Sequence, residues 1–141
     1  MSSNAFSGVG TVFARDTTPD SSGTAYVDLA EVNSISGPDM TRATIDVTSL
    51  DSTDGYEEFI ASFRNAGKIS LNMNFTATTF NMLVADFESD DLVSYRITLS
   101  DSSATTIVFN GLVTGLSVAI PAKDKVSSDV VIKITGKPVI A

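Results

Sequence analysis

The feature that most constrains the fold is a run of nine residues, 68–76, in which polar and apolar side chains alternate without interruption. Successive side chains of a strand point to opposite faces, so this period of two predicts a half-buried β-strand. One face is apolar, formed by Ile69, Leu71, Met73 and Phe75. The other is polar and uncharged, formed by Ser70, Asn72 and Asn74.

Several other segments also have the composition of strands or turns. Loop residues gather in 16–23, and turn residues in 101–103 and 121–128. Gly111 lies where the inward-facing set changes phase, which predicts a β-bulge or a sheet corner. We expect strands or extended chain over 9–15, 25–35, 41–48, 93–99, 105–120 and 130–135.

Two segments have a helical period instead. In residues 54–67 the apolar positions recur at i, i+3, i+4 and i+7, with Asp54 as the N-cap, Glu57 three residues later and Gly67 at the end. Residues 79–88 repeat that spacing after Thr78 or Thr79 as N-cap. The two predicted apolar stripes are Tyr56, Phe59, Ile60 and Phe63 in the first segment, and Phe80, Leu83, Val84 and Phe87 in the second.

This order of elements predicts a mainly β protein of the α+β class. We expect a β-sandwich or partly closed barrel with two short α-helices packed on it. No repeat or linker divides the 141 residues, so the sequence predicts one domain over 1–141, with residues 1–8 flexible.

The charge distribution argues against a protein that grips nucleic acid. The formal net charge is −8, and the nine Lys and Arg residues are scattered singly along the sequence. Sequence-independent binding of phosphates needs clustered cations. We also find no signal peptide and no apolar run that would span a bilayer, so we expect a soluble chain made in the cytoplasm.

The residues offer little for catalysis. The chain has neither Cys nor His, which excludes thiol chemistry, His-based proton transfer and the usual zinc sets. Acids cluster at 51–58 and 86–91, where helix capping or a solvated loop explains them better than Ca²⁺ binding. We therefore predict no catalytic residue, cofactor or metal, and a protein that is not an enzyme.

An ordered series of motifs resembles a known family. The series runs from Ile35-Ser36-Gly37-Pro38 through residues 44–48, Asp51 and the aromatic segment to Ala66-Gly67 and the alternating strand. It closes on residues 133–138, KITGKP. Over residues 8–140 the chain resembles the major tail tube protein of long-tailed phages with flexible, non-contractile tails.

The resemblance implies a structural virion protein, located in the tail and assembled in the host cytoplasm. Its subunits close into hexameric rings, which stack into a hollow tube around a tape measure protein. DNA later passes through the tube without specific binding. A tail terminator and tail-tip proteins meet its ends, and no membrane is involved.

Under this resemblance two surfaces become candidate sites. The segment 37–54 is expected to be an extended arm that reaches a neighbouring subunit or ring, and the uncharged polar face of residues 70–74 is expected to line the lumen. The arm candidates are Pro38, Asp39, Asp46, Leu50 and Asp51, and the lumen candidates are Ser70, Asn72 and Asn74.

Three alternatives stay open at the level of sequence. The segment 37–54 is also consistent with an ordinary mobile surface loop. A subunit of a type VI secretion-like tube shares the expected architecture. A carbohydrate-binding or adhesin-type β-sandwich would need an exposed aromatic platform, for which Tyr26 is the candidate.

Overall fold

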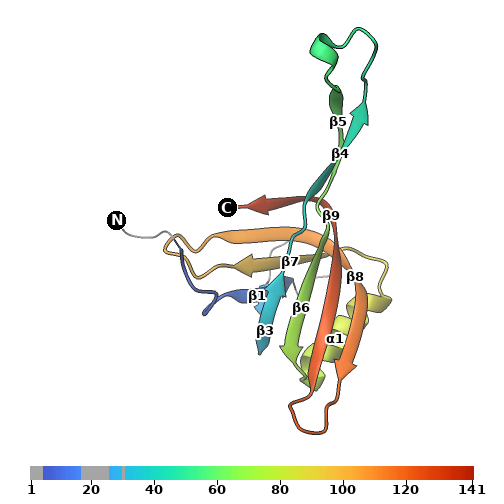
Figure 1. Ribbon diagram of the computed structural model, residues 1–141. Helices are drawn as coiled ribbons and strands as arrows, with labels where there is room; N and C mark the ends of the chain where they lie inside the picture. The colour runs from blue at the N-terminus through green and yellow to red at the C-terminus, as the bar shows by residue number, and fades with distance from the viewer. Residues whose placement is uncertain (1–4, 17–25, 30) are drawn as a thin grey trace.

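A computed structural model describes residues 5–16, 26–29 and 31–141 of the chain (Figure 1). The predictions for residues 1–4 and for most of the loop at 16–23 fall outside the described residues. The elements are β1 (Val12–Asp16), β2 (Tyr26–Asp28), β3 (Val32–Ser36), β4 (Thr41–Asp46), a 3₁₀ turn (Thr53–Gly55), β5 (Phe59–Asn65), β6 (Lys68–Asn74), α1 (Ala77–Glu88), β7 (Val93–Thr98), β8 (Thr106–Ala119) and β9 (Ser127–Ile140).

Seven of these strands form one antiparallel sheet in the order β2-β1-β7-β8-β9-β6-β3. Strands β2 and β3 lie at opposite edges of that order, yet only residues 29–31 separate them in the chain. Asp28 and Val32 are four residues apart and are joined by at most about 14 Å of extended chain, so the sheet has to curl until its two edges approach each other. The result is the unclosed, sandwich-like β architecture that the sequence predicts.

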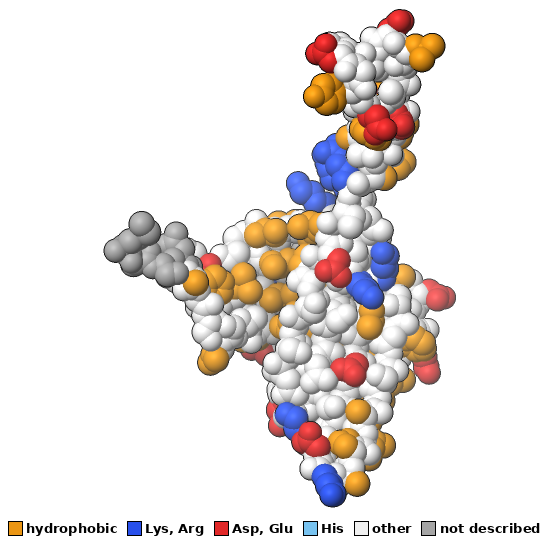
Figure 2. Space-filling view, in the orientation of Figure 1, with side chains coloured by type: hydrophobic (Ala, Val, Ile, Leu, Met, Phe, Trp, Pro, Cys, Tyr) orange, Lys and Arg blue, Asp and Glu red, His pale blue; other side chains and the backbone are white. Residues whose placement is uncertain are grey.

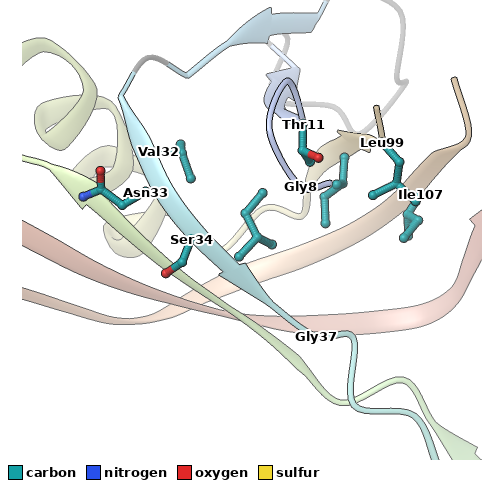
Figure 3. A pocket seen from close by; sticks show the side chains of 10 residues that line it. Gly8, Thr11, Val32, Asn33, Ser34, Gly37, Leu99 and Ile107 are labelled. Atoms are coloured by element: carbon teal, nitrogen blue, oxygen red, sulfur yellow. The ribbon is translucent and has the colours of Figure 1, made fainter. Parts of the chain in front are cut away.

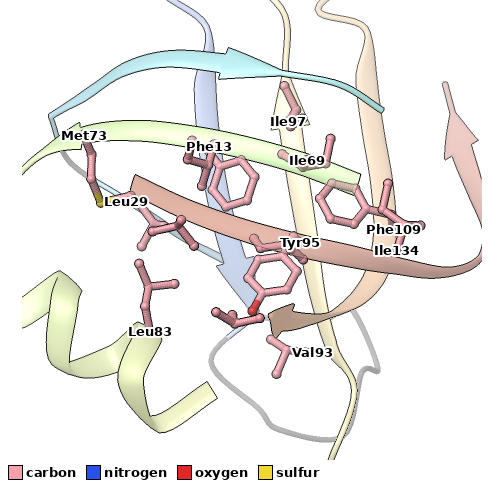
Figure 4. Close-up of a cluster of buried hydrophobic side chains, with 14 residues drawn as sticks. Phe13, Leu29, Ile69, Met73, Leu83, Val93, Tyr95, Ile97, Phe109 and Ile134 are labelled. Atoms are coloured by element: carbon pink, nitrogen blue, oxygen red, sulfur yellow. The ribbon is translucent and has the colours of Figure 1, made fainter. Parts of the chain in front are cut away.

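The core lies inside the curled sheet, where side chains from both halves meet (Figure 4). Phe13 of β1, Tyr95 of β7 and Phe109 of β8 form an aromatic cluster with ring centroids 5.7–6.4 Å apart. The alternating run forms β6 and confirms the predicted strand. Its residues Ile69, Leu71 and Met73 are buried against the rest of the core.

Helix α1 confirms the second helical prediction, but its N-cap residue is Thr76, so the predicted caps Thr78 and Thr79 lie inside the helix. Its buried face also differs from the predicted stripe. The buried positions are Thr79, Leu83 and Asp86. Phe87 is 50% exposed, and Phe80 packs on Phe75 with ring centroids 5.3 Å apart. The face is rotated because Asp86 turns inward to an ion pair with Arg15, as described below.

The first predicted helix is wrong. Residues 59–65 form strand β5, which pairs with β4 in a separate two-stranded sheet that projects from the body of the molecule (Figure 1). Asp54 lies in the 3₁₀ turn with φ of 56°, so it is no N-cap. Gly67 ends no helix either; it joins β5 to β6 with φ of 80°.

The role predicted for Gly111 also needs correction. Gly111 is in regular register with Val93 and Ile134, and the irregularities of β8 lie on either side of it, between 108 and 110 and between 113 and 115. A Cβ at Gly111 would lie 2.7 Å from the carbonyl oxygen of Lys133. The glycine thus permits close approach of β9, and the bulge near residue 114 buries Val113 and exposes Thr114.

Candidate functional site

The β4–β5 hairpin, residues 41–65, exposes an unusual amount of apolar surface. Except for Ser52 and Ser62, every residue in it is exposed. Phe63 is 90% and Tyr56 74% exposed. The exposed large apolar residues on or beside the hairpin are Met40, Ile45, Val47, Leu50, Tyr56, Phe59, Ile60 and Phe63. An exposed apolar surface of this size, confined to one projecting element, indicates an interaction surface.

Pairing within the hairpin does not compensate for this exposure. Ile45 faces Ile60 and Asp46 faces Phe59 in an antiparallel register that is broken between Arg42 and Thr44. An isolated two-stranded hairpin is marginally stable in water, and three strands or a packed face are usually needed. The hairpin therefore has the properties of an element that is completed by another chain.

Two glycines fix the direction in which the hairpin leaves the sheet. Gly37 precedes β4 and Gly67 follows β5, and both have positive φ, at 110° and 80°. A Cβ on Gly67 would overlap the carbonyl group of Asp39, and one on Gly37 would overlap the carbonyl oxygen of Lys68. The chain thus crosses itself closely at the base of the hairpin, where only glycine fits.

The structure distributes the predicted arm residues along this hairpin. Pro38 and Asp39 lie at its base, Asp46 ends β4, and Leu50 and Asp51 lie in the exposed tip. The predicted segment 37–54 is only the first half of the projection, which continues through β5 to residue 65. At Asp46, hydrogen bonds from the hydroxyl and backbone N–H of Thr48 lower the pKa of the carboxyl group.

The predicted lumen residues lie together on the outward face of β6. There the side-chain amide of Asn33 donates to the amide oxygens of Asn72 and Asn74, at 3.1 and 3.0 Å. The amide of Asn72 donates to Asp129 Oδ1 at 2.7 Å. Sequence reasoning missed Asp129, which strand pairing brings in from β9. A hollow of about 350 Å³ over this face is lined by Ser34, Ser36, Ser70, Asn72 and Asp129, among others.

A second cavity marks the place where the curled sheet stays open (Figure 3). Its volume is about 400 Å³, and it lies between edge strand β3, the segment before β1 that contains Gly8 and Thr11, and the adjoining ends of β7 and β8. Val32, Ile35, Ile97, Leu99 and Ile107 give it an apolar lining. Its lining contains no ionisable side chain, so we interpret it as a gap between the two edges of the curled sheet and not as an active site.

One buried polar cluster was not predicted. Asp86 accepts hydrogen bonds from Arg15 Nε at 2.6 Å and from the Tyr95 hydroxyl at 3.0 Å, and it forms an ion pair with the Arg15 guanidinium. Burial, together with the Asp86 charge, raises the pKa of Tyr95. The cluster ties α1 to β1 and β7. Sequence grouping placed Asp86 with the exposed acids Glu88, Asp90 and Asp91 because only the fold brings Arg15 to it.

Tyr26, the candidate sugar platform, is already engaged. Its ring is covered by the Arg96 guanidinium, 4.5 Å from the centroid, and its hydroxyl lies 2.7 Å from Ser94 Oγ. In the described part of the chain, no three potential metal ligands come together.

The comparison with protein families shows to which family the chain belongs. Residues 5–141 match the family described as lambda phage tail tube protein. The chain belongs to the lambda phage tail tube protein family. It is therefore a structural tube subunit of a virion tail. Among the described residues, no helix has the length and apolarity that a bilayer span requires.

The fold is shared with tube-like assemblies of low sequence identity. A chain from the tail of an empty GTA particle is 19% identical, with a TM-score of 0.76, coverage of 97% of this chain and 99% of that chain. A chain from the anti-feeding prophage baseplate is 16% identical, with a TM-score of 0.70 and coverage of 100% and 97%. The SPP1 tail tube is 4% identical, with a TM-score of 0.65 and coverage of 92% and 75%. No curated protein sequence gives a significant match.

Proposed function

We propose that this family member assembles into stacked hexameric rings, which form the tube through which DNA passes into the host. The observation that carries the proposal is the β4–β5 hairpin, whose apolar side chains are exposed in the monomer. Burying one such side chain contributes about 2 kcal/mol. A surface of eight such residues favours association with other copies.

The hairpin serves in this proposal as the arm that reaches a neighbouring subunit or ring. Pro38 and Asp39 set its base, and Asp46, Leu50 and Asp51 belong to the part that contacts the neighbour. The sheet edges β2 and β3 support a ring as well. Unpaired strand edges are commonly covered by a neighbouring chain, and a head-to-tail contact that closes on itself makes a ring.

The outward face with Ser70, Asn72 and Asn74 is proposed to line the lumen. Besides amide and hydroxyl groups, the face contains the carboxylate of Asp129, which accepts a hydrogen bond from Asn72. Ser70, Asn72 and Asn74 carry no positive charge; the cations beside them are Lys125, whose Nζ lies 3.4 Å from Asn33 Oδ1, and Lys68 with Lys133 at the hairpin end of the face. Between these lysines the wall offers phosphate groups no cation, so DNA would slide along it with few release steps.

The partners follow from the same proposal. They are further copies of the chain, a tape measure protein inside the tube, and terminator and tail-tip proteins at its ends. The similar folds include a chain from a sheath/tube terminator and one from a tube-terminating cap. The role is structural rather than catalytic.

Excision of the hairpin tests its role in assembly. Thr41 and Asn65 are direct cross-strand partners, so an Asn-Gly turn joins them after removal of residues 42–64. The shortened chain should keep the core and unfold cooperatively, because the hairpin contributes no residue to the buried cluster. Negative-stain microscopy should show tubes for the full chain and none for the shortened one. Normal tubes from the shortened chain would show that the hairpin is not needed for assembly.

A charge introduced on the outward face tests the lumen assignment. Asn74→Lys is preferable to Asn72→Lys, because a lysine at 72 would be neutralised by Asp129. The matched control is Ser102→Lys in the exposed turn after β7. In a phage lacking its own tube protein, both variants should assemble tails, but Asn74→Lys should reduce DNA delivery. Equal infectivity of the two variants would show that Asn74 does not line the lumen.

A secretion or injection tube is the second candidate. It is favoured by one observation, the shared fold with a chain from the sheath–tube complex of an extracellular contractile injection system, at a TM-score of 0.67. Genes for a capsid and terminase beside this gene would support the phage tail, and genes for a sheath and effectors the injection tube.

A further inference from the structure

The two ends of the β4–β5 hairpin carry opposite charges. Its tip, residues 46–58, carries five acidic residues and no Lys or Arg. All five acids are exposed. Figure 2 shows acidic side chains at the far end of the projection and basic ones where it meets the sheet. The acids of the tip are Asp46, Asp51, Asp54, Glu57 and Glu58.

The root of the hairpin has the opposite charge, and its cations face one another. Arg42 lies directly opposite Arg64, and Lys68 directly opposite Lys133. Like charges in directly opposed positions destabilise an antiparallel pair. Among the described residues, the only ion pair joins Arg15 to Asp86. None of the four root cations is therefore paired with a carboxylate of the described residues.

The tip of a chain does not neutralise its own root. Asp46, the tip acid nearest to Arg42 along β4, is four residues from it, which is about 13 Å of extended chain. That exceeds the Debye length of about 8 Å at physiological ionic strength, so the attraction between them is screened. Among the described residues, neither the acids of the tip nor Asp39 at the base form an ion pair with the root cations.

We propose that the acidic tip of one copy docks on the basic root of a second copy. This inference rests on the assembly proposed above and names the contact that orients it. Tip and root are different surfaces, so the contact is head-to-tail and repeats from copy to copy. Exposed apolar side chains of β5, among them Phe63, lie between the two ends and are buried in the contact. The charges set its register and direction, as charged rims do in other interfaces.

A charge-swap experiment tests the contact. Arg42→Glu with Arg64→Glu reverses the root, and Asp51→Lys with Asp54→Lys reverses the tip. Either reversal alone should raise the critical concentration for tube formation at least tenfold, and the chain carrying all four changes should recover most of that loss. Lys123→Glu with Lys125→Glu, in the turn between β8 and β9, is the control with the same charge change. Sedimentation gives the critical concentration, and microscopy shows whether single rings or monomers replace the tubes.

Two further measurements keep the test decisive. The neutral variant Arg42→Gln with Arg64→Gln should assemble with a weaker dependence on salt than the wild type. Each unassembled variant should unfold in urea like the wild type, because all changed residues are exposed. An unchanged critical concentration for the reversed root, or no recovery in the fourfold variant, would overturn the proposal. A wild-type chain that forms no tubes would instead overturn the proposed function.

Discussion

Replacing Phe63 with Ser should separate folding from assembly. Phe63 is 90% exposed in the single chain, so its side chain adds almost nothing to the free energy of unfolding. The expected change in that free energy is below about 0.5 kcal/mol, as for other exposed positions. If the side chain is buried between copies, the loss per added subunit is about 2 kcal/mol. That corresponds to a rise of about 30-fold in the critical concentration.

Two measurements on the same protein check these expectations. Urea unfolding at low protein concentration gives the stability of the single chain, and sedimentation over a concentration series gives the threshold for tubes. Phe63→Leu is the matched control, since it keeps an apolar side chain and should keep the wild-type threshold. A Phe63→Ser chain with a normal threshold, or one destabilised by more than about 1.5 kcal/mol as a monomer, would refute the reasoning.

Three further changes probe the scaffold. Gly67→Ala should destabilise the chain more than Gly55→Ala in urea unfolding, because both glycines have positive φ but only at Gly67 would the Cβ overlap another residue; equal effects would contradict the crossing at Asp39. Asp86→Asn should lower the free energy of unfolding by about 3 kcal/mol, since it removes the ion-pair partner of the half-buried Arg15 side chain. Pairing Asp86→Leu with Arg15→Met should recover part of the loss, and an Asp86→Asn chain of unchanged stability would show that the ion pair is dispensable. Burial raises the pKa of Tyr95, so the neutral Tyr95 side chain stabilises the fold fully below about pH 10, and the free energy of unfolding falls by about 1.4 kcal/mol per pH unit as the pH rises further. Tyr95→Phe should flatten this slope in alkaline unfolding. An unchanged slope would show that Tyr95 is not the group responsible.

Most of the sheet was predictable because its strands bury one face in the chain's own core. The run 68–74 alternates because Ile69, Leu71 and Met73 pack inside, while Ser70, Asn72 and Asn74 do not. The second helix was predictable for a similar reason, since Leu83 anchors it in the core. The order of the strands was not predictable, because nothing local reveals that β2 and β3 lie at opposite edges of one sheet.

The partners of the buried and clustered polar side chains were not predictable either, because nothing local in the sequence reveals them. The Arg15–Asp86 pair joins residues 71 positions apart, and the bond from Asn72 to Asp129 joins residues 57 positions apart. Sequence patterns identify which residues are polar. They do not identify which polar residues the strand register brings within hydrogen-bond distance.

The failed helix prediction has a cause that bears on function. A helical period was inferred at Tyr56, Phe59, Ile60 and Phe63 on the assumption that apolar residues share a face turned toward their own core. In the hairpin these residues have no such core, and all of them are exposed. Their spacing is therefore not set by burial within the chain. An apolar pattern of this kind is expected where the burying surface belongs to another molecule. Arg42 and Arg64, which lie opposite each other and form no ion pair with any described residue, fit the same explanation. The segment for which the helix prediction is wrong is thus the segment that we propose to contact another copy of the chain.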